Sequence, residues 1–177
     1  LGSFHARDRI LVVLKSGECY TTDFSDSIHI EENLLRIEKN EPRKIWTAVY
    51  YDADQKYHYI KRFSVEEDQK RENILGDNPK NELLLLTDTY YPRLLVGRKE
   101  KDGELRTVEI DVEEFALVKS IRARGKRIAP YLIDQVEELP PLKESPIFEE
   151  VSEEPHGDEP EEEADLFSSS SEEAPTE

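Results

Sequence analysis

Five cationic side chains lie within nine positions of this chain. They are Lys119, Arg122, Arg124, Lys126 and Arg127. Arginine keeps its charge at any biological pH, and neighbouring like charges repel one another. Such a cluster indicates an anionic ligand, and it suits contacts to the phosphates of duplex DNA, which position the duplex without reading its bases. Gly125 lies inside the run, where it allows a tight turn or a close approach to a ligand.

Two further pairs of cations extend this candidate phosphate-binding set. Lys61 and Arg62 lie within a predicted strand, and Arg43 and Lys44 stand just before another one. Aromatic residues do not alternate with the cations of 119–127, which disfavours stacking on single-stranded bases. The competing interpretation of the run is a charged edge strand that prevents aggregation.

The charge of the chain is divided unevenly along its length. The net charge of the 177 residues is −17, from 24 basic and 41 acidic side chains. Residues 144–177 hold 14 of the acidic residues and no Lys or Arg, so residues 1–143 carry 24 basic against 27 acidic residues, a net charge of −3. The segment 141–177 is poor in apolar residues and rich in Pro, Ser and Glu, which predicts a disordered acidic tail. Such a tail either solubilises the protein or competes with an anionic ligand for the cations.

The residues that enzymes use for catalysis are not arranged for it here. The four histidines have no metal-ligand spacing, and the single cysteine, Cys19, cannot build a zinc site. The sequence has no glycine-rich loop of the kind that cradles a nucleotide. The pairs Glu113–Glu114 and Asp52/Asp54 fit a solvated face better than a cation site in a chain with 37% charged residues. We therefore expect no catalytic residue, no metal site and no cofactor in this chain.

The cellular context follows from two further features. One cysteine allows no internal disulfide, which fits a reducing compartment. No apolar run approaches the roughly 20 residues of a membrane span, so we expect a cytoplasmic protein without a membrane partner. The chain contains no methionine, even at position 1, and we expect it to be the C-terminal piece of a larger protein.

Short strands and turns account for most of residues 1–140. No stretch of 12 or more residues keeps a helical period, and turn signals recur every eight to twelve residues, which indicates an all-β sandwich, barrel or propeller. Helical turns are expected only at 66–73 and 111–115, the first within a connecting loop over 64–80. Two β-rich halves suggest repeated blades. The expected strands are 10–14, 19–24, 34–37, 45–51, 57–63, 83–86, 90–96, 105–112, 115–121 and 127–136.

Several motifs together resemble a known family. They occur in the order Leu1–His5, DRILVVLKSGECYTTDF, KIWTAVYYDADQKYHYIKRF, ELLLLTDTYYPR and EIDVEEFALVKSIRARGKRI. They resemble the C-terminal region of the A subunit of bacterial topoisomerase IV, of the gyrase A-subunit family, most strongly in its Bacteroidetes form. The resemblance covers most of residues 1–139, and the tail is similar only in its acidic composition.

The resemblance implies a fold, a ligand and partners. The fold is a partial β-pinwheel, a propeller-like ring, here of about three blades over residues 1–140, whose basic rim bends duplex DNA. The parent enzyme would be an ATP-dependent type II topoisomerase in the cytoplasm, associated with the nucleoid. Its ATP, Mg²⁺, catalytic tyrosine, B subunit and second A subunit engage other parts of the parent. The Gly- and Arg-rich wrapping box of the gyrase relatives does not occur here, since Arg124-Gly125-Lys126-Arg127 is only a short echo of it. The alternative from another class is a propeller-like protein-interaction module without a nucleic-acid role.

Overall fold

The computed structural model of the chain describes residues 4–5, 7–23 and 31–148. Its contacts divide the chain into one compact unit, Leu1–Pro146, and a second segment, Ile147–Glu177. The first unit contains every helix and strand described below. Most of the segment predicted to be a disordered tail, 141–177, lies outside the described residues.

The first sheet has the strand order β3-β1-β2-β6. β1 and β2 form the predicted hairpin, with Val13 opposite Cys19, and Gly17 closes the turn at φ +91°. This positive φ favours glycine because a side chain would clash there. The strands are β1 (Arg9–Leu14), β2 (Glu18–Asp23), β3 (Leu34–Lys39) and β6 (Glu72–Asn73).

The second sheet has the order β10-β5-β4-β7, with β11 also paired to β5. β4 and β5 form a long antiparallel hairpin that runs from Trp46 opposite Phe63 to Asp52 opposite Tyr57. This hairpin positions the cationic run 119–127, because β10 and β11, at the two ends of the run, both pair with β5. The strands are β4 (Trp46–Asp52), β5 (Tyr57–Phe63), β7 (Glu82–Thr87), β10 (Val118–Lys119) and β11 (Lys126–Arg127).

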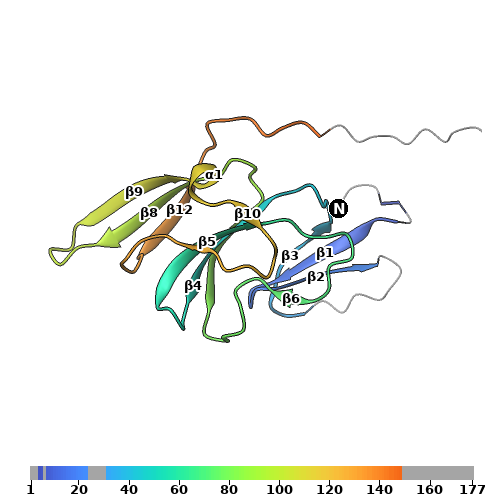
Figure 1. Cartoon of the computed structure of the whole chain (residues 1–177), viewed down its shortest axis with the longest axis horizontal. Coiled ribbons are helices and arrows are strands. Elements are labelled where there is room, and N and C mark those ends of the chain that lie inside the picture. The colour runs from blue at the N-terminus through green and yellow to red at the C-terminus, as the bar shows by residue number, and fades with distance from the viewer. Residues whose placement is uncertain (1–3, 6, 24–30, 149–177) are drawn as a thin grey trace, which may run out of the picture. The chain divides into compact units, whose positions relative to one another are not determined.

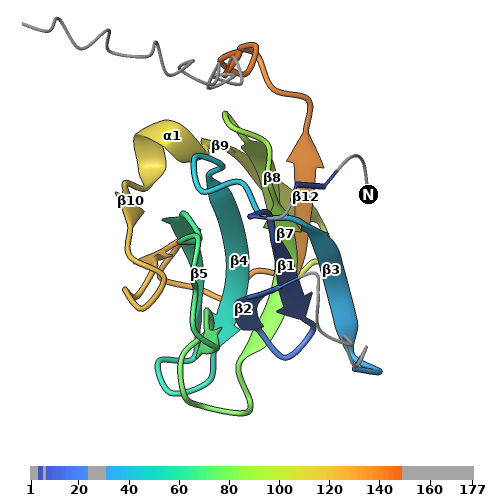
Figure 2. The same cartoon turned by 90° about the vertical axis from the view of Figure 1, so that its right-hand side faces the viewer.

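The third sheet has the order β12-β8-β9. A short helix, α1 (Val112–Phe115), follows β9 directly, and the Asp111 side chain caps it by accepting hydrogen bonds from the amides of Glu113 and Glu114. Figure 1 shows this sheet, the β4–β5 sheet and the β1–β2 sheet one after another, and Figure 2 shows β4 between β5 and β7. The strands are β8 (Arg93–Lys99), β9 (Leu105–Asp111) and β12 (Gln135–Leu139).

The middle sheet is buried on both of its faces. Trp46, Ala48 and Tyr50 of β4 join the core cluster that includes the first sheet, whereas Val49 joins the cluster built on the third sheet. Successive side chains of a strand point to opposite faces, so β4 supplies apolar side chains to two cores at once. This explains why apolar side chains follow one another in β4, interrupted by the buried Thr47, and do not alternate with exposed polar ones.

The all-β, propeller-like fold class expected from the sequence is confirmed, and the described residues form three sheets. The expected helical turn at 111–115 is confirmed as α1. The helical turn expected at 66–73 is wrong, because this segment contains β6 and bonds to β2. The strand expected at 90–96 begins only at Arg93, since Pro92 has no amide hydrogen to donate to a neighbouring strand.

The two strands expected at 115–121 and 127–136 are also wrong. β10 and β11 have only two residues each, and β12 begins at Gln135. The apolar residues of 115–121 are not a sheet face, since Phe115 ends α1 and Ile121 enters the first core from a turn. Most of this segment therefore follows an irregular path along the edge of β5.

Candidate nucleic-acid interface

The cationic run 119–127 arches over the edge of strand β5. β10 lies parallel to β5, with Lys119 opposite Phe63, and β11 lies antiparallel to it, with Lys126 opposite Ile60. The chain must reverse direction between these pairings, and a turn closed by the Ala123 amide on the Ser120 carbonyl (3.0 Å) makes the reversal. We call residues 119–127 the cationic loop. Its two ends are fixed on one strand, so its middle projects from the sheet edge.

Gly125 brings the cationic loop into direct contact with the backbone of β5. A Cβ atom at this position would lie 2.5 Å from the Ile60 carbonyl oxygen, closer than real Cβ contacts come. The Gly125 amide also donates a hydrogen bond to the Tyr50 hydroxyl at 3.1 Å. The sequence interpretation allowed either a tight turn or close approach to a ligand, and the structure shows close approach to the chain's own strand.

All five cations of the loop are exposed, but their partners differ. Arg122 forms an ion pair with Glu72 of β6, and Arg124 lies 3.8 Å from the Asp52 carboxylate. The Lys126 ammonium lies 4.5 Å from the centre of the Phe115 ring, and the Arg127 guanidinium 4.8 Å from that of Tyr57. The structure gives Lys119 no ion pair with any residue that it describes.

Lys61 does not belong to this exposed surface. It is 4% exposed, and its ammonium donates hydrogen bonds to the carbonyls of Ile74 (2.9 Å) and Ile121. Burial lowers its pKa from 10.5 to about 8, and burial also raises the pKa of the nearby Cys19 thiol to about 12. Lys61 therefore anchors the loop at Ile121 and is too buried to meet a phosphate at the surface.

Arg62 is buried as well, at 5% exposure. Its guanidinium donates to the carbonyls of Ala116 (3.3 Å) and Tyr90 (3.4 Å), while its Nε has no hydrogen-bond partner. From the sequence we expect Lys61 and Arg62 among the surface cations, because the alternation of side chains along a strand predicts only the face of the sheet on which a side chain lies. It does not predict that β10 and β11 later cover the strand's edge.

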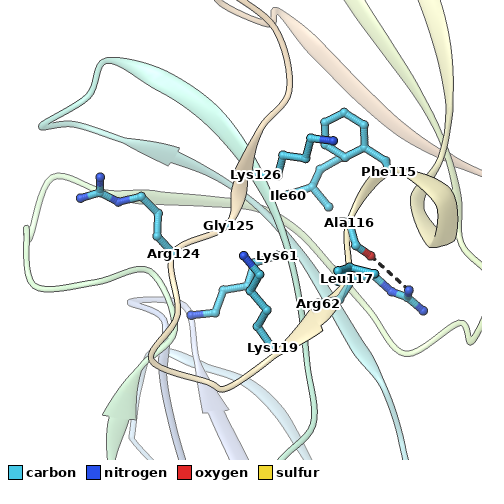
Figure 3. Close-up of a pocket in the computed structure, with 10 residues that line it drawn as sticks. All are labelled: Ile60, Lys61, Arg62, Phe115, Ala116, Leu117, Lys119, Arg124, Gly125 and Lys126. Atoms are coloured by element: carbon cyan, nitrogen blue, oxygen red, sulfur yellow. Dashed lines mark hydrogen bonds between the residues drawn. The ribbon is translucent and has the colours of Figure 1, made fainter.

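A pocket of about 340 Å³ opens between the cationic loop and the α1–β10 segment. Figure 3 shows Lys126 lying against Phe115, Arg62 reaching the Ala116 carbonyl, and the Arg124 side chain pointing away from the other labelled residues. The pocket has cationic walls and a partly apolar floor. Its lining residues are Ile60, Lys61, Arg62, Phe115, Ala116, Leu117, Lys119, Arg124, Gly125 and Lys126.

Comparison with known families decides the affiliation of the chain. A family model described as "Topoisomerase C-terminal domain, Bacteroidota" matches residues 1–140. The chain belongs to this family. No curated protein and no solved structure matches the chain significantly. The match spans all three sheets of this topoisomerase C-terminal domain and includes the whole cationic loop.

The second predicted pair of cations in the topoisomerase C-terminal domain lies before β4. Lys44 is held between the carboxylates of Glu38 (2.6 Å) and Asp88 (2.8 Å), and Arg43 is exposed. Partial burial opposes the charge of Lys44, but the hydrogen bonds to Asp88 and Glu38 outweigh it and raise the pKa of the amine. Lys44 is thus already neutralised by two carboxylates, whereas each loop arginine meets a single carboxylate and Lys126 lies against an aromatic ring.

Sequence reasoning missed the residues that hold the cationic loop in place. Tyr50, Glu72 and Phe115 contact Gly125, Arg122 and Lys126, respectively. No short-range pattern could identify the first two, because 75 and 50 positions separate the partners. Among the described residues, no group of three or more His, Cys, Asp or Glu side chains gathers as a metal site. No described helix is long and apolar enough to cross a membrane.

Replacing Gly125 with alanine is expected to lift the cationic loop from β5. The new methyl group would overlap the Ile60 carbonyl, and overpacking of this kind costs about 1–3 kcal/mol. We expect a lower midpoint of urea unfolding and faster hydrogen exchange of the Gly125 and Lys126 amides. Ser120→Ala, in the same loop, is the control and should leave both unchanged. Retention of wild-type exchange in Gly125→Ala would show that the contact is not tight.

Proposed function

We propose that this domain binds duplex DNA through the phosphates of its backbone and bends it. The observation that carries the proposal is the cationic loop, a projecting arc with five exposed cations on a body whose net charge is only −3. Family membership supports the assignment, because the family is named for topoisomerases. Lysine and arginine on such an arc release counterions from the duplex, which favours binding at every sequence alike.

The resemblance of the sequence motifs to topoisomerase IV A subunits supports a proposal about the larger enzyme to which the domain belongs. We propose that the domain belongs to the A subunit of a type IIA topoisomerase, of the topoisomerase IV and gyrase kind, and acts on DNA topology in the cytoplasm at the nucleoid. In this proposal the domain itself is not catalytic. ATP, Mg²⁺, the B subunit and the second A subunit bind other parts of the parent enzyme. The domain contributes by holding and curving one duplex segment.

Fluorescence anisotropy on two unrelated duplexes of equal length tests the binding proposal. We expect similar affinities for both duplexes, and a logarithm of the affinity that falls linearly with the logarithm of salt concentration. End-to-end energy transfer within a doubly labelled duplex tests bending, since a bent duplex brings its ends together. Absence of binding at 50 mM salt (about the low end of the usual range) would overturn the proposal.

The acidic tail gives a second test of the same electrostatics. Deleting residues 144–177 removes 14 acidic residues and no basic one. A tethered polyanion competes with DNA phosphates at a high effective concentration, so we expect the trimmed chain to bind duplex DNA more tightly at low salt. A chain whose tail is replaced by a neutral Gly/Ser segment of equal length is the control, and it should match the trimmed chain. Equal affinities for the full and trimmed chains would refute the competition.

One observation favours the alternative of a protein-interaction module. A groove of about 220 Å³ between β3 and β7 is lined mostly by leucines, and Leu35 and Leu84 are 39% and 41% exposed. Exposed apolar patches mark many protein-binding surfaces. This alternative predicts no salt-dependent affinity for DNA, so the anisotropy experiment distinguishes the two functions.

A further inference from the structure

An exposed leucine precedes the cationic loop. Among the described large apolar residues up to the end of β12, Leu117 is the most exposed, at 77%. The next residue, Val118, is 43% exposed. An apolar side chain stabilises a fold only where it is removed from water, and exposed apolar side chains that adjoin one another can mark a contact surface. Packing of the domain therefore does not explain the leucine at this position.

The backbone on both sides of Leu117 is held in place. On one side, the Ala116 amide donates to the Val112 carbonyl (3.0 Å), and the Ala116 carbonyl accepts from the Arg62 guanidinium (3.3 Å). On the other side, Val118 pairs with Arg62 of β5. Figure 3 shows the bond from Arg62 to the Ala116 carbonyl, next to Leu117. One buried arginine thus fixes both neighbours of the leucine, so little ordering of the backbone remains to oppose binding of a ligand there.

The pocket that Leu117 borders is cationic. Lys119, Arg124 and Lys126 line it together with the leucine, and no Asp or Glu is among its ten lining residues. All three of these cations are exposed or half-buried at the surface. A ligand that matches both features presents anionic groups with apolar surface between them. Duplex DNA is such a ligand, because its stacked bases lie between two rows of phosphates.

We propose that Leu117 is a wedge that enters the minor groove of duplex DNA and partly unstacks one base step, which kinks the duplex. The inference rests on the proposed function and adds to it the contact that causes the bend. Proteins that bend DNA from the minor groove insert apolar side chains of this type between base steps. Lys119 and Lys126 contact the phosphates beside the opened step, since the minor groove is only about 6 Å wide.

The wedge does not read the identity of bases. A leucine side chain offers neither a hydrogen-bond donor nor an acceptor, so its contact depends on how easily a base step opens. Unrelated duplexes of mixed sequence each contain easily opened steps, and similar affinities for them agree with the wedge. The wedge instead predicts a preference for a duplex that is already unstacked at one position.

End-to-end energy transfer in a doubly labelled duplex tests the wedge. We expect the wild type at saturation to raise the transfer, and Leu117→Ala at saturation to lose most of this rise. The side chain is exposed, so Leu117→Ala should fold with an unchanged melting temperature. Leu117→Met keeps an apolar side chain of similar length and should bend the duplex as the wild type does. A full rise with Leu117→Ala would overturn the wedge and leave a partner protein as the occupant of this surface, while the proposed function stands.

A duplex of the same sequence with one central mismatch gives a second readout. Unstacking costs least at a mismatched base pair, so we expect the wild type to bind the mismatched duplex about tenfold more tightly than the matched one. Leu117→Ala should bind the two duplexes with equal affinity. Equal affinities already in the wild type, or the same preference in Leu117→Ala, would overturn the wedge.

The matched control is Leu132→Ala, which makes the same chemical change elsewhere. Leu132 is 53% exposed in the connection between β11 and β12, and it does not line the pocket. The control should bend the duplex and prefer the mismatch as the wild type does, and equal losses in both alanine variants would overturn the wedge. Binding without a bend in the wild type would overturn the wedge and leave phosphate binding in place. Absence of any duplex binding by the wild type at low salt would overturn the wedge together with the proposed function.

Discussion

Replacing Arg122, Arg124 and Lys126 together with alanine is expected to reduce the salt dependence of duplex binding. Each phosphate contact contributes about 0.9 to the slope of log affinity against log salt, so three lost contacts lower the slope by about 2.7. The loss should be the same on unrelated DNA sequences, because phosphate contacts carry no sequence information. Arg122 must first leave Glu72, so its own share should be the smallest of the three.

The control for this prediction is a variant with the same change in charge elsewhere. Lys99, Lys101 and Arg106 border the turn between β8 and β9, and their replacement by alanine should change the slope much less. A loss of affinity on only one DNA sequence would contradict a phosphate-binding role for the cationic loop. Equal slopes of log affinity against log salt for the two triple variants would contradict it as well. Unchanged binding in both variants would place the DNA contact on another surface.

The buried Lys61 is expected to make the protein more stable at high pH. Its pKa is lowered from 10.5 to about 8 by burial, and a difference of one in pKa corresponds to about 1.4 kcal/mol. Below pH 8 the amine is charged in both states, and the folded protein bears the cost of burying it. Between pH 8 and 10.5 the folded state loses its proton first, so the free energy of unfolding rises by about 3 kcal/mol from this residue.

Urea unfolding of the wild type and of Lys61→Met from pH 7 to 11 isolates this contribution. Cys19 acts in the opposite direction, because burial raises its pKa from 9.0 to about 12, and its stabilisation is lost as pH rises above 9. Subtracting the Lys61→Met profile removes the Cys19 contribution and that of the surface lysines. A flat difference across this range would mean that Lys61 is not buried as an amine without a counter-ion.

Local sequence patterns predicted the sheets well and the surroundings of the cationic loop poorly. The hairpins β1–β2 and β4–β5 were predictable because each combines strand-forming residues with a nearby turn, and their pairing partners are close in sequence. The family resemblance was visible in several ordered motifs and is matched over residues 1–140. The five cations of the loop were visible because their density is unusual for an acidic chain.

The burial of Lys61 and Arg62 could not be predicted from local sequence. It depends on β10 and β11, which lie 54 or more positions later in the sequence. β10 pairs with β5 in parallel, and β11 pairs with it antiparallel. Each of these bridges is only two residues long, too short to give a periodic signal. Gly125 was noticed as a permissive position, but only the structure shows that its missing side chain is what allows the loop to touch Ile60.

Mapping the duplex on the protein by ¹H–¹⁵N spectra tests directly whether the cationic loop binds DNA. The chain has a mass of 20.6 kDa, and its amide signals can be followed during titration with a short duplex at low salt. We expect the largest shifts within the cationic loop and in β5 beneath it, and we expect them to reverse when salt is raised. Shifts confined to the leucine-lined groove of β3 and β7, or no shifts at all, would contradict it.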